Sequence, residues 1–575
     1  MSSLAILLGS IVIFIIAYLT YGSWLAKTWG IDPTKETPAH TEDDGGVDYV
    51  PAKAPVLLGH HFASIAGAGP INGPIQAAVF GWVPVFLWIV IGGIFFGAVQ
   101  DFSAIFVSIR HKGHSLGEVI EENISHRCKI LFSVFAWLVL LLVVAAFADI
   151  VASSFNGFAL KKEVVDGVEK VVQVANDNNG SVATASMLFI PLAALFGFLV
   201  YRKNAPLLVS SVVGVALLAL CVVGGLAFPI HMSKNFWLIV IFLYIVVASV
   251  TPVWILLQPR DYLNSFLLYF MMIAAVVGIV GTNPAVSIPA STGWFANNAA
   301  KWPMFPFLFI TVACGAISGF HSIVGSGTTS KQLDNEKDAK MIGYGGMLIE
   351  CVLAVISLLT IASLGYEGAK GMAPPVVFAT AIKNFFVNLG FGAWAANATF
   401  TVILLAISAF ALTSLDTATR LGRYIFQELF ASKDANSKNP LNNMFVATII
   451  TVFFGGILCM GGYLNIWPLF GACNQLVAVP AFLAAATYLG NRGRNNKMFY
   501  FPTIFMMAAC MVSLFMSFIA NVKILAAGNG KLLVQGLQTV VIVPIFVLAI
   551  LLFVEGWKTI VNPRKAKLAQ EQSGK

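Results

Sequence analysis

An apolar segment, 57–81, is long enough to cross a membrane but contains a run of helix-breaking residues: Gly67, Gly69, Pro70, Gly73 and Pro74. Each proline removes a backbone donor and each glycine disfavours the helix, so the sequence predicts an interrupted helix. Freed backbone groups need partners in a membrane, so such an interruption is stable only against a cavity or other protein. Asn72 before Pro74 predicts a restart there, because asparagine caps helices and proline fits a first turn. Two half-helices meeting at membrane depth are typical of transporter binding sites; a kinked structural helix is the alternative.

The half-helix that restarts at 72–75 would present free amides and its positive dipole end to that cavity. Such a site suits a carboxylate, so we expect an organic anion or a zwitterion as the ligand. A second interruption is predicted in segment 236–257, which contains Thr251-Pro252. The residues that we assign to substrate binding are Gly69, Pro70, Asn72, Gly73, Pro74, Thr251 and His321.

Acidic residues inside a membrane are costly and therefore indicate function. Asp149 and Glu350 lie inside apolar segments and lack close charged neighbours in sequence, which makes them candidates for carrying a proton. His60, His61 and His321 lie near the apolar segments, and each is either a proton carrier or a satisfied packing residue.

Hydroxyl groups are dense where segment 304–320 continues into Ser326, Thr328 and Thr329. Such a glycine-rich helix end either ligates a small cation or forms hydrogen bonds to a neighbouring helix. Charged residues near two other helix ends have a gating or a structural role: Arg260 with Asp261, and Asp416 with Arg420.

A polytopic membrane protein must position these residues, because the 575-residue chain is 58% apolar and 10% charged. With about 20 apolar residues per span, we predict an all-α fold without a separate soluble domain. Its fifteen spans are 4–25, 57–81, 83–108, 128–156, 184–202, 205–228, 236–257, 265–282, 304–320, 341–366, 396–416, 441–460, 465–489, 498–520 and 535–556. The first of them lacks a basic n-region, so we interpret it as a retained span rather than a signal peptide.

Several classes of protein are disfavoured by the composition. The net charge of +8 needs no nucleic-acid partner, since basic cytoplasmic segments of a membrane protein account for it. The seven cysteines form no Cys-x-x-Cys pair, so we expect no metal site, no disulfide scaffold and no cofactor. The absence of a Gly-x-x-x-x-Gly-Lys-Ser/Thr loop argues against a primary pump. We expect a transporter rather than an enzyme, with a channel as the nearest alternative.

Lysine and arginine predict the orientation. If the C-terminus is cytoplasmic, 25 of the 34 basic residues lie on the cytoplasmic side of the fifteen spans. The N-terminus and loop 157–183 are then outside, whereas loop 417–440 is inside.

Several strings resemble the carbon starvation protein A (CstA) family, and together they extend from about residue 57 to 490. They are Gly-Pro-Ile-Asn-Gly-Pro at 69–74, Phe-Gly-Trp-Val-Pro at 80–84, Leu-Gln-Pro-Arg-Asp-Tyr-Leu-Asn at 257–264, Phe-His-Ser-Ile-Val-Gly-Ser-Gly-Thr-Thr-Ser-Lys-Gln at 320–332, Leu-Asp-Thr-Ala-Thr-Arg-Leu-Gly-Arg-Tyr at 415–424 and Trp-Pro-Leu-Phe-Gly-Ala-Cys-Asn-Gln at 467–475. A further string, Gly-Ala-Val-Gln-Asp-Phe at 97–102, departs from the family at Gln100, where histidine is expected. This departure argues against a proton role for that position.

The resemblance implies a multi-pass importer of the inner membrane that takes up peptides or pyruvate during carbon starvation. It also implies the inverted five-plus-five-helix core of amino-acid/polyamine/organocation transporters. We place that core at 57–416, with repeats 57–228 and 236–416, after a first span and loop at 1–56 and before accessory spans at 417–575. The sequence specifies the partners only as a small-molecule substrate and the lipid bilayer, and it leaves the oligomeric state open.

Two coupling ions fit these expectations. By carry-over from the superfamily, sodium would bind the carbonyls of residues 66–69, including Ala66 and Gly67, and the hydroxyls of Ser326, Thr328 and Thr329. A proton would instead titrate Glu350, Asp149 or His321, and the family resemblance favours this assignment. The alternatives are a sodium-coupled amino-acid or organic-anion symporter, or a membrane nutrient sensor.

Overall fold

The computed structural model describes residues 2–561 except 43–47, 166–167, 204, 253, 298–300, 431–438 and 529. Helices dominate the fold, as predicted, and the sheet of the described residues is one antiparallel hairpin of β1 (Phe158–Val165) and β2 (Val168–Ala175). Its register pairs Phe158 with Ala175. Most of the predicted basic C-terminal segment 558–575 and part of loop 417–440 lie outside the described residues.

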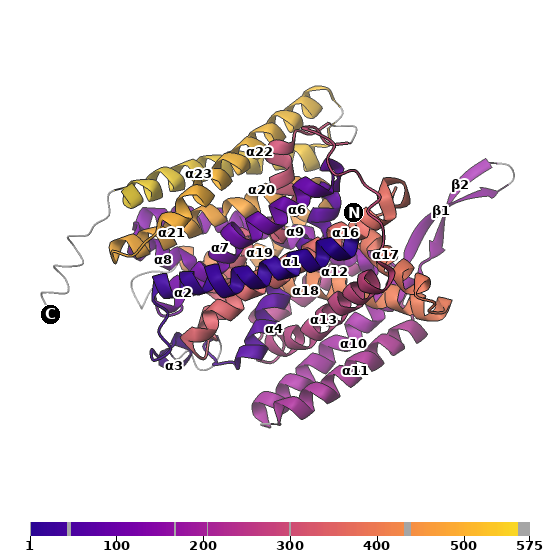
Figure 1. Ribbon diagram of the computed structural model, residues 1–575, viewed down its shortest axis with the longest axis horizontal. Coiled ribbons are helices and arrows are strands. Elements are labelled where there is room, and N and C mark those ends of the chain that lie inside the picture. The colour runs from indigo at the N-terminus through magenta and orange to yellow at the C-terminus, as the bar shows by residue number, and fades with distance from the viewer. Residues whose placement is uncertain are drawn as a thin grey trace, which may run out of the picture.

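Twelve helices of the described chain are long and apolar enough to cross a membrane (Figure 1). They comprise α1 (Ser3–Ala17) with α2 (Ser23–Trp29), α6 (Trp82–Gly92) with α7 (Ala98–Ile109), α9 (His126–Phe155), α10 (Asp177–Gly197), α11 (Leu207–Ala227), α13 (Leu257–Thr282), α14 (Met304–Val312) with α15 (Gly319–Gly327), α16 (Gly346–Gly368), α18 (Ala393–Phe430), α20 (Tyr463–Leu476) with α21 (Ala478–Asn491), α22 (Tyr500–Ala526) and α23 (Leu537–Val561).

The remaining three predicted spans fall on shorter helices. These are α4 (Ala54–Ile65) with α5 (Gly69–Ala77), α12 (Lys234–Val250) and α19 (Met444–Cys459). Three further helices, α3 (Pro38–Thr41), α8 (Leu116–Asn123) and α17 (Pro374–Asn388), connect the longer ones.

Four of these helices form a central scaffold. Side-chain caps fix where three of them begin, because Ser125, Ser233 and Asn443 accept hydrogen bonds from the first-turn amides of α9, α12 and α19. The long helix α18 packs along α9, and α12 and α19 lie against both. Outside the scaffold, α1 and α11 expose large apolar side chains such as Val12, Leu208 and Val212, as expected for surfaces that face lipid.

Two helices are interrupted in mid-course. The first interruption, at 66–68 between α4 and α5, is the predicted one. The second was predicted in 236–257, and this is wrong: α12 ends at Val250, and the next helix, α13, begins at Leu257 as a separate span. The second interruption instead lies at 313–318, between α14 and α15, where Ala313 has a φ of 36°. The predicted span 304–320 therefore contains two half-helices, and α5 packs against this break.

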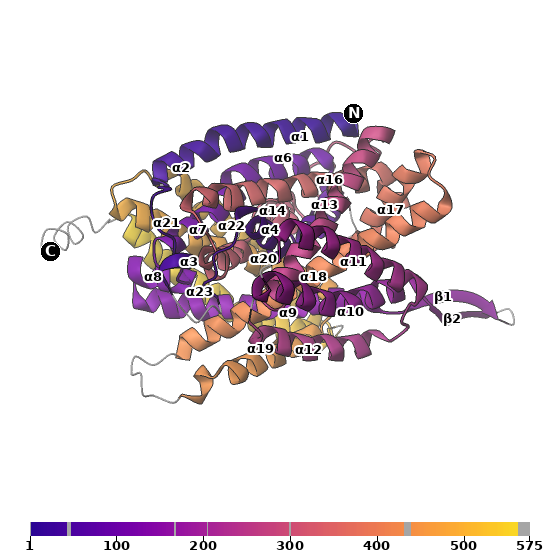
Figure 2. The same cartoon turned by 90° about the horizontal axis from the view of Figure 1, so that it is seen from below.

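The two ends of the molecule carry different segments. Figures 1 and 2 show α2, α3 and α8 at one end and the β1–β2 hairpin, α17 and the start of α1 at the other. This arrangement places the N-terminal end of α1 on the same side as residues 158–175, as the predicted topology requires.

The orientation itself is a testable prediction. Lys112 beside α8 and Asp177 beside β2 have side chains 70% and 77% exposed, so a cysteine at either position is accessible to a label. On a cysteine-free background in right-side-out vesicles, we expect Asp177→Cys to react with a membrane-impermeant maleimide at once, and Lys112→Cys only after permeabilisation. The reverse pattern would show that the positive-inside assignment is wrong.

Candidate functional site

The first interruption separates two buried half-helices. α4 ends at Ile65 and α5 begins at Gly69, with Pro70 in its first turn. The predicted restart at Asn72 is therefore three residues too late. The backbone N–H of Asn72 already donates to the carbonyl of Ala68, the residue before α5, as a residue inside the helix does. Proline fits the first turn without losing a hydrogen bond, so Pro70 rather than Asn72 determines where the helix restarts.

Glycines let the two interruptions approach each other closely. A Cβ on Gly73 would lie 2.5 Å from the Val312 carbonyl oxygen and 2.7 Å from that of Thr311. A Cβ on Gly69 would lie 2.5 Å from the Cys314 sulfur. These two predicted substrate-binding residues therefore hold α5 against the end of α14, and Pro74, inside α5, packs beside them near Gly315.

Asn72, a predicted substrate-binding residue, lies in α5 close to the first interruption. Its side chain is fully buried, and neither its amide oxygen nor its amide nitrogen has a hydrogen-bond partner among the described residues. Leaving a buried polar group unpaired costs about 1–3 kcal/mol, so this side chain calls for a partner such as a bound water, an ion or a ligand.

A buried cluster joins three helices around His321. Its Nδ1 lies 2.9 Å from an Asp101 oxygen on α7, and its Nε2 lies 3.5 Å from a Glu350 oxygen on α16. All three side chains are inaccessible to solvent. The structure therefore brings together two predicted site residues, His321 and Glu350, and adds Asp101, whose role the sequence did not indicate.

Further polar contacts hold the helices around this cluster. His61 on α4 lies 2.8 Å from the Thr329 hydroxyl, just beyond α15. The Gln100 amide donates to the Ser318 carbonyl at the second interruption. At the position where the family is expected to have histidine, Gln100 thus forms a structural contact, which agrees with the expectation that this position does not carry a proton.

A second buried network surrounds Arg260, which is 1% exposed. Its guanidinium bonds Asp261 at 3.0 Å and pairs with Asp416 on α18. The Tyr244 hydroxyl donates to Asp416 at 2.7 Å, and His60 on α4 lies 3.0 Å from Asp261. The network therefore ties α4, α12, α13 and α18 together. The predicted pairing of Asp416 with Arg420 along one helix is wrong, since Asp416 pairs across helices instead.

Arg420 and Asp149 have partners that the sequence did not indicate. Arg420 donates to the backbone carbonyls of Ala248 and Thr251 at the end of α12. Thr251 thus lies in this contact, and the structure does not bring it to the first interruption. Asp149 forms an ion pair of 2.6 Å with Lys234 at the start of α12, which gives it a structural alternative to proton transfer.

The hydroxyl groups among the proposed sodium ligands have hydrogen-bond partners within the protein. The Ser326 and Thr328 hydroxyls donate to carbonyls one turn earlier in α15, and Thr329 contacts His61. Ala66 and Gly67 lie at the first interruption, where the residue facing Gly67 is Ser414 of α18.

Comparisons with known proteins point to one family. The family model described as carbon starvation protein CstA matches residues 2–377 and 366–513. The peptide transporter CstA of Bacillus subtilis is 32% identical over 534 residues, which cover 85% of each chain. The pyruvate/proton symporter BtsT of Escherichia coli is 30% identical over 588 residues, covering 85% of this chain and 77% of that protein. A solved manganese transporter from Eremococcus coleocola aligns with 92% of this chain and 98% of its own, at 14% identity and a TM-score of 0.46, which is too weak a likeness to carry an argument.

Proposed function

The chain belongs to the carbon starvation protein CstA family, as its motifs predicted, and we propose that it is a secondary transporter importing peptides or pyruvate. Relatives that share about a third of its residues carry the names of peptide transporters and of a pyruvate/proton symporter. We place this import in the cytoplasmic membrane during carbon starvation, in line with the family's description.

The observation that carries the proposal is the packing of two interrupted helices against each other. Interruptions leave helix ends and unpaired backbone groups at membrane depth, which is where secondary transporters bind substrates. Residues 66–68 and 313–318 supply two such breaks, and α5 lies between them and contacts α14. The unpaired Asn72 amide group lies in the same half-helix.

We assign the helices to two inverted repeats of five. The first consists of α4–α5, α6–α7, α9, α12 and α13, and the second of α14–α15, α16, α18, α19 and α20–α21. Each repeat then opens with an interrupted helix. The repeats also start at opposite ends: α4 follows α3, whereas α14 follows the loop in which Ala285 pairs with Ser2.

This assignment moves the boundaries that the sequence indicated. The repeats become 54–282 and 304–491, because the second interruption lies at 313–318 rather than in 236–257. The hairpin, α10 and α11 are then an insertion within the first repeat, and α1–α2, α22 and α23 are accessory helices.

The N-terminal end of α5 suits a carboxylate. The first turn of α5, from Gly69, has amides without helical partners, and the helix dipole adds a partial positive charge there. The side-chain amide of Asn72 supplies both a donor and an acceptor for the rest of the ligand. Pyruvate and peptides share the carboxylate that this arrangement would bind.

We propose that the coupling ion is a proton bound by Asp101, His321 and Glu350. With all three groups ionised this buried cluster carries a net charge of −1, and binding one proton makes it neutral. An uncompensated charge inside a membrane protein is costly, so proton uptake would favour the states in which the cluster is sealed from water. The Ser326 and Thr328 hydroxyls already donate to carbonyls in α15, which also supports the proton.

Imposed gradients test this function. In proteoliposomes that contain the full chain, we expect an inward proton gradient to drive accumulation of labelled pyruvate or L-alanyl-L-alanine. An inward sodium gradient alone should have no effect, and Thr328→Ala should transport normally. Accumulation driven by sodium alone and removed by Thr328→Ala would overturn proton coupling. Failure to transport either substrate under either gradient would overturn the proposed function.

A further inference from the structure

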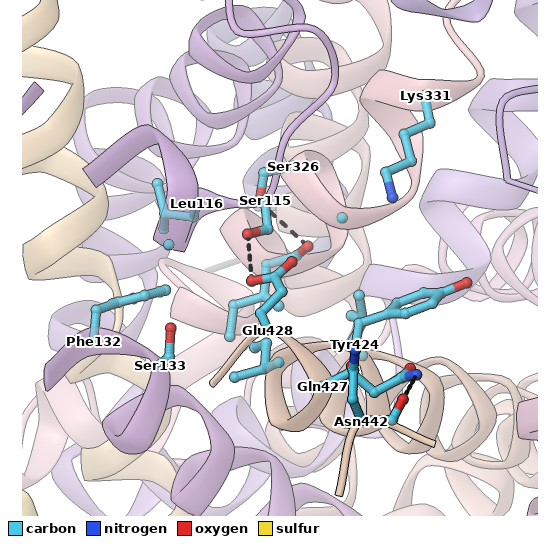
Figure 3. Close-up of a pocket in the computed structure, with 15 residues that line it drawn as sticks. Ser115, Leu116, Phe132, Ser133, Ser326, Lys331, Tyr424, Gln427, Glu428 and Asn442 are labelled. Atoms are coloured by element: carbon cyan, nitrogen blue, oxygen red, sulfur yellow. Dashed lines mark hydrogen bonds between the residues drawn. The ribbon is translucent and has the colours of Figure 1, made fainter. Parts of the chain in front are cut away.

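A cavity of about 250 Å³ lies away from both interruptions, among α8, α9, α15 and α18. It is at the end of the molecule that carries α2 and α3, which the basic residues assign to the cytoplasm. Figure 3 shows Lys331 and Glu428 reaching into this space from different walls. The liquid volume of one water molecule is about 30 Å³, so the cavity has room for several water molecules. An amino acid or a dipeptide with small side chains fits in that space.

Glu428 supplies a partly buried carboxyl group with free bonding capacity. One of its oxygens accepts a hydrogen bond of 2.8 Å from the Ser115 hydroxyl, and no other hydrogen bond to this carboxylate joins it to the described residues. An ionised carboxylate accepts about four hydrogen bonds. The remaining capacity matches an ammonium group, which has three donors to place.

Lys331 supplies the opposite charge. Its ammonium lies 5.2 Å from the centre of the Tyr49 ring and 5.3 Å from that of Tyr424, so two cation–π contacts hold it in place. No acidic side chain of the described residues forms a salt bridge with it, and its charge remains available to a carboxylate.

The other walls of the cavity suit a small organic molecule. Phe132, Ile323 and Leu421 give it an apolar lining, and Ser133 adds a buried hydroxyl. The cavity therefore combines an anionic group, a cationic group and an apolar surface.

We propose that this cavity binds a small zwitterion, a short peptide or amino acid, with its ammonium on Glu428 and its carboxylate on Lys331. Lys331 ends the short helical turn Thr329–Lys331 that comes after α15, whereas Glu428 belongs to the scaffold helix α18. A ligand that bridges them would hold these two helices together. That such a ligand is also the imported substrate rests on the proposed function; the binding at the cavity does not.

Calorimetric titration of the full chain in lipid nanodiscs with L-alanyl-L-alanine tests the proposal. The Gly73→Leu chain, in which α5 is displaced from α14, is titrated beside the wild type, so that binding at the cavity is distinguished from binding at the first interruption. We expect Glu428→Gln and Lys331→Met each to weaken binding at the cavity about tenfold or more, because each removes a charged partner. The matched controls are Glu122→Gln and Lys112→Met. Both residues are exposed and lie outside the cavity lining, so these variants should bind normally.

Ligand analogues separate the two charges. N-acetyl-alanyl-alanine lacks the ammonium and alanyl-alanine amide lacks the carboxylate, so each should bind the wild-type cavity about tenfold more weakly or worse. Undiminished binding of both analogues, or of L-alanyl-L-alanine to both variants, would overturn the site, as would the absence of binding. Uptake of the labelled dipeptide by the wild type is measured in parallel, so that a failure of transport is distinguished from a failure of this site.

Discussion

Glu350→Gln is expected to abolish proton-driven accumulation while substrate exchange continues. Gln keeps the size of Glu but does not titrate, so the cluster with Asp101 and His321 keeps its packing and loses one of its proton-binding groups. Proton transfer groups typically contribute about 100-fold or more to rate, and we expect a loss of that order in uptake driven by a pH gradient.

The extent of accumulation gives a second, independent measurement. With one proton per substrate, a gradient of one pH unit supports roughly tenfold accumulation, since about 1.4 kcal/mol corresponds to a factor of ten. The variant should equilibrate substrate across the membrane without concentrating it. Counterflow of labelled against unlabelled substrate requires no gradient and should persist.

A matched control lies on the same helix. Glu367, also on α16, has a side chain that is 88% exposed, and Glu367→Gln should accumulate substrate as the wild type does. Wild-type accumulation by Glu350→Gln would show that this carboxyl does not carry the coupling proton. Loss of both counterflow and accumulation in Glu350→Gln would point instead to a structural role of this carboxyl group.

Local sequence signals predicted one interruption and missed the other. Residues 66–74 contain three glycines and two prolines, and their intrinsic effect on a helix is enough to break it. Residues 313–318 contain a single glycine and no proline. Their break accompanies the packing of α5, whose Gly69 and Gly73 lie against this region, and such a tertiary cause leaves no local pattern.

The identity of the candidate site residues was easier to predict than their partners. A carboxyl or imidazole inside an apolar span is conspicuous in any sequence, which is why Glu350 and His321 were identified. Their neighbour Asp101 is 220 positions away from His321, and Arg260 is 156 from Asp416. Only the arrangement of the helices determines such pairs. The short-range alternative, Asp416 with Arg420, was therefore wrong.

Gly73→Leu is expected to reduce uptake about 100-fold or more, since misplacement by 1 Å near a binding site is enough for such a loss. The Cβ alone would lie 2.5 Å from the Val312 carbonyl oxygen, and the neighbouring group at 2.7 Å is also a backbone carbonyl. Backbone does not rotate away as a side chain does, so α5 must separate from α14. Overpacking of this kind typically costs about 1–3 kcal/mol, which lowers stability but leaves the protein in the membrane.

The control substitution places the same side chain where there is room. Gly9 on α1 is exposed, and a Cβ there would meet no atom within 4 Å, so Gly9→Leu should transport normally. Size-exclusion chromatography of a fluorescent fusion measures whether each variant is folded, and uptake of labelled pyruvate or dipeptide measures function. Gly73→Ala should fall between Gly73→Leu and the wild type, because its single methyl group is the smallest wedge between α5 and α14. Wild-type uptake by a folded Gly73→Leu protein would show that the contact between the two interrupted helices is not required for transport.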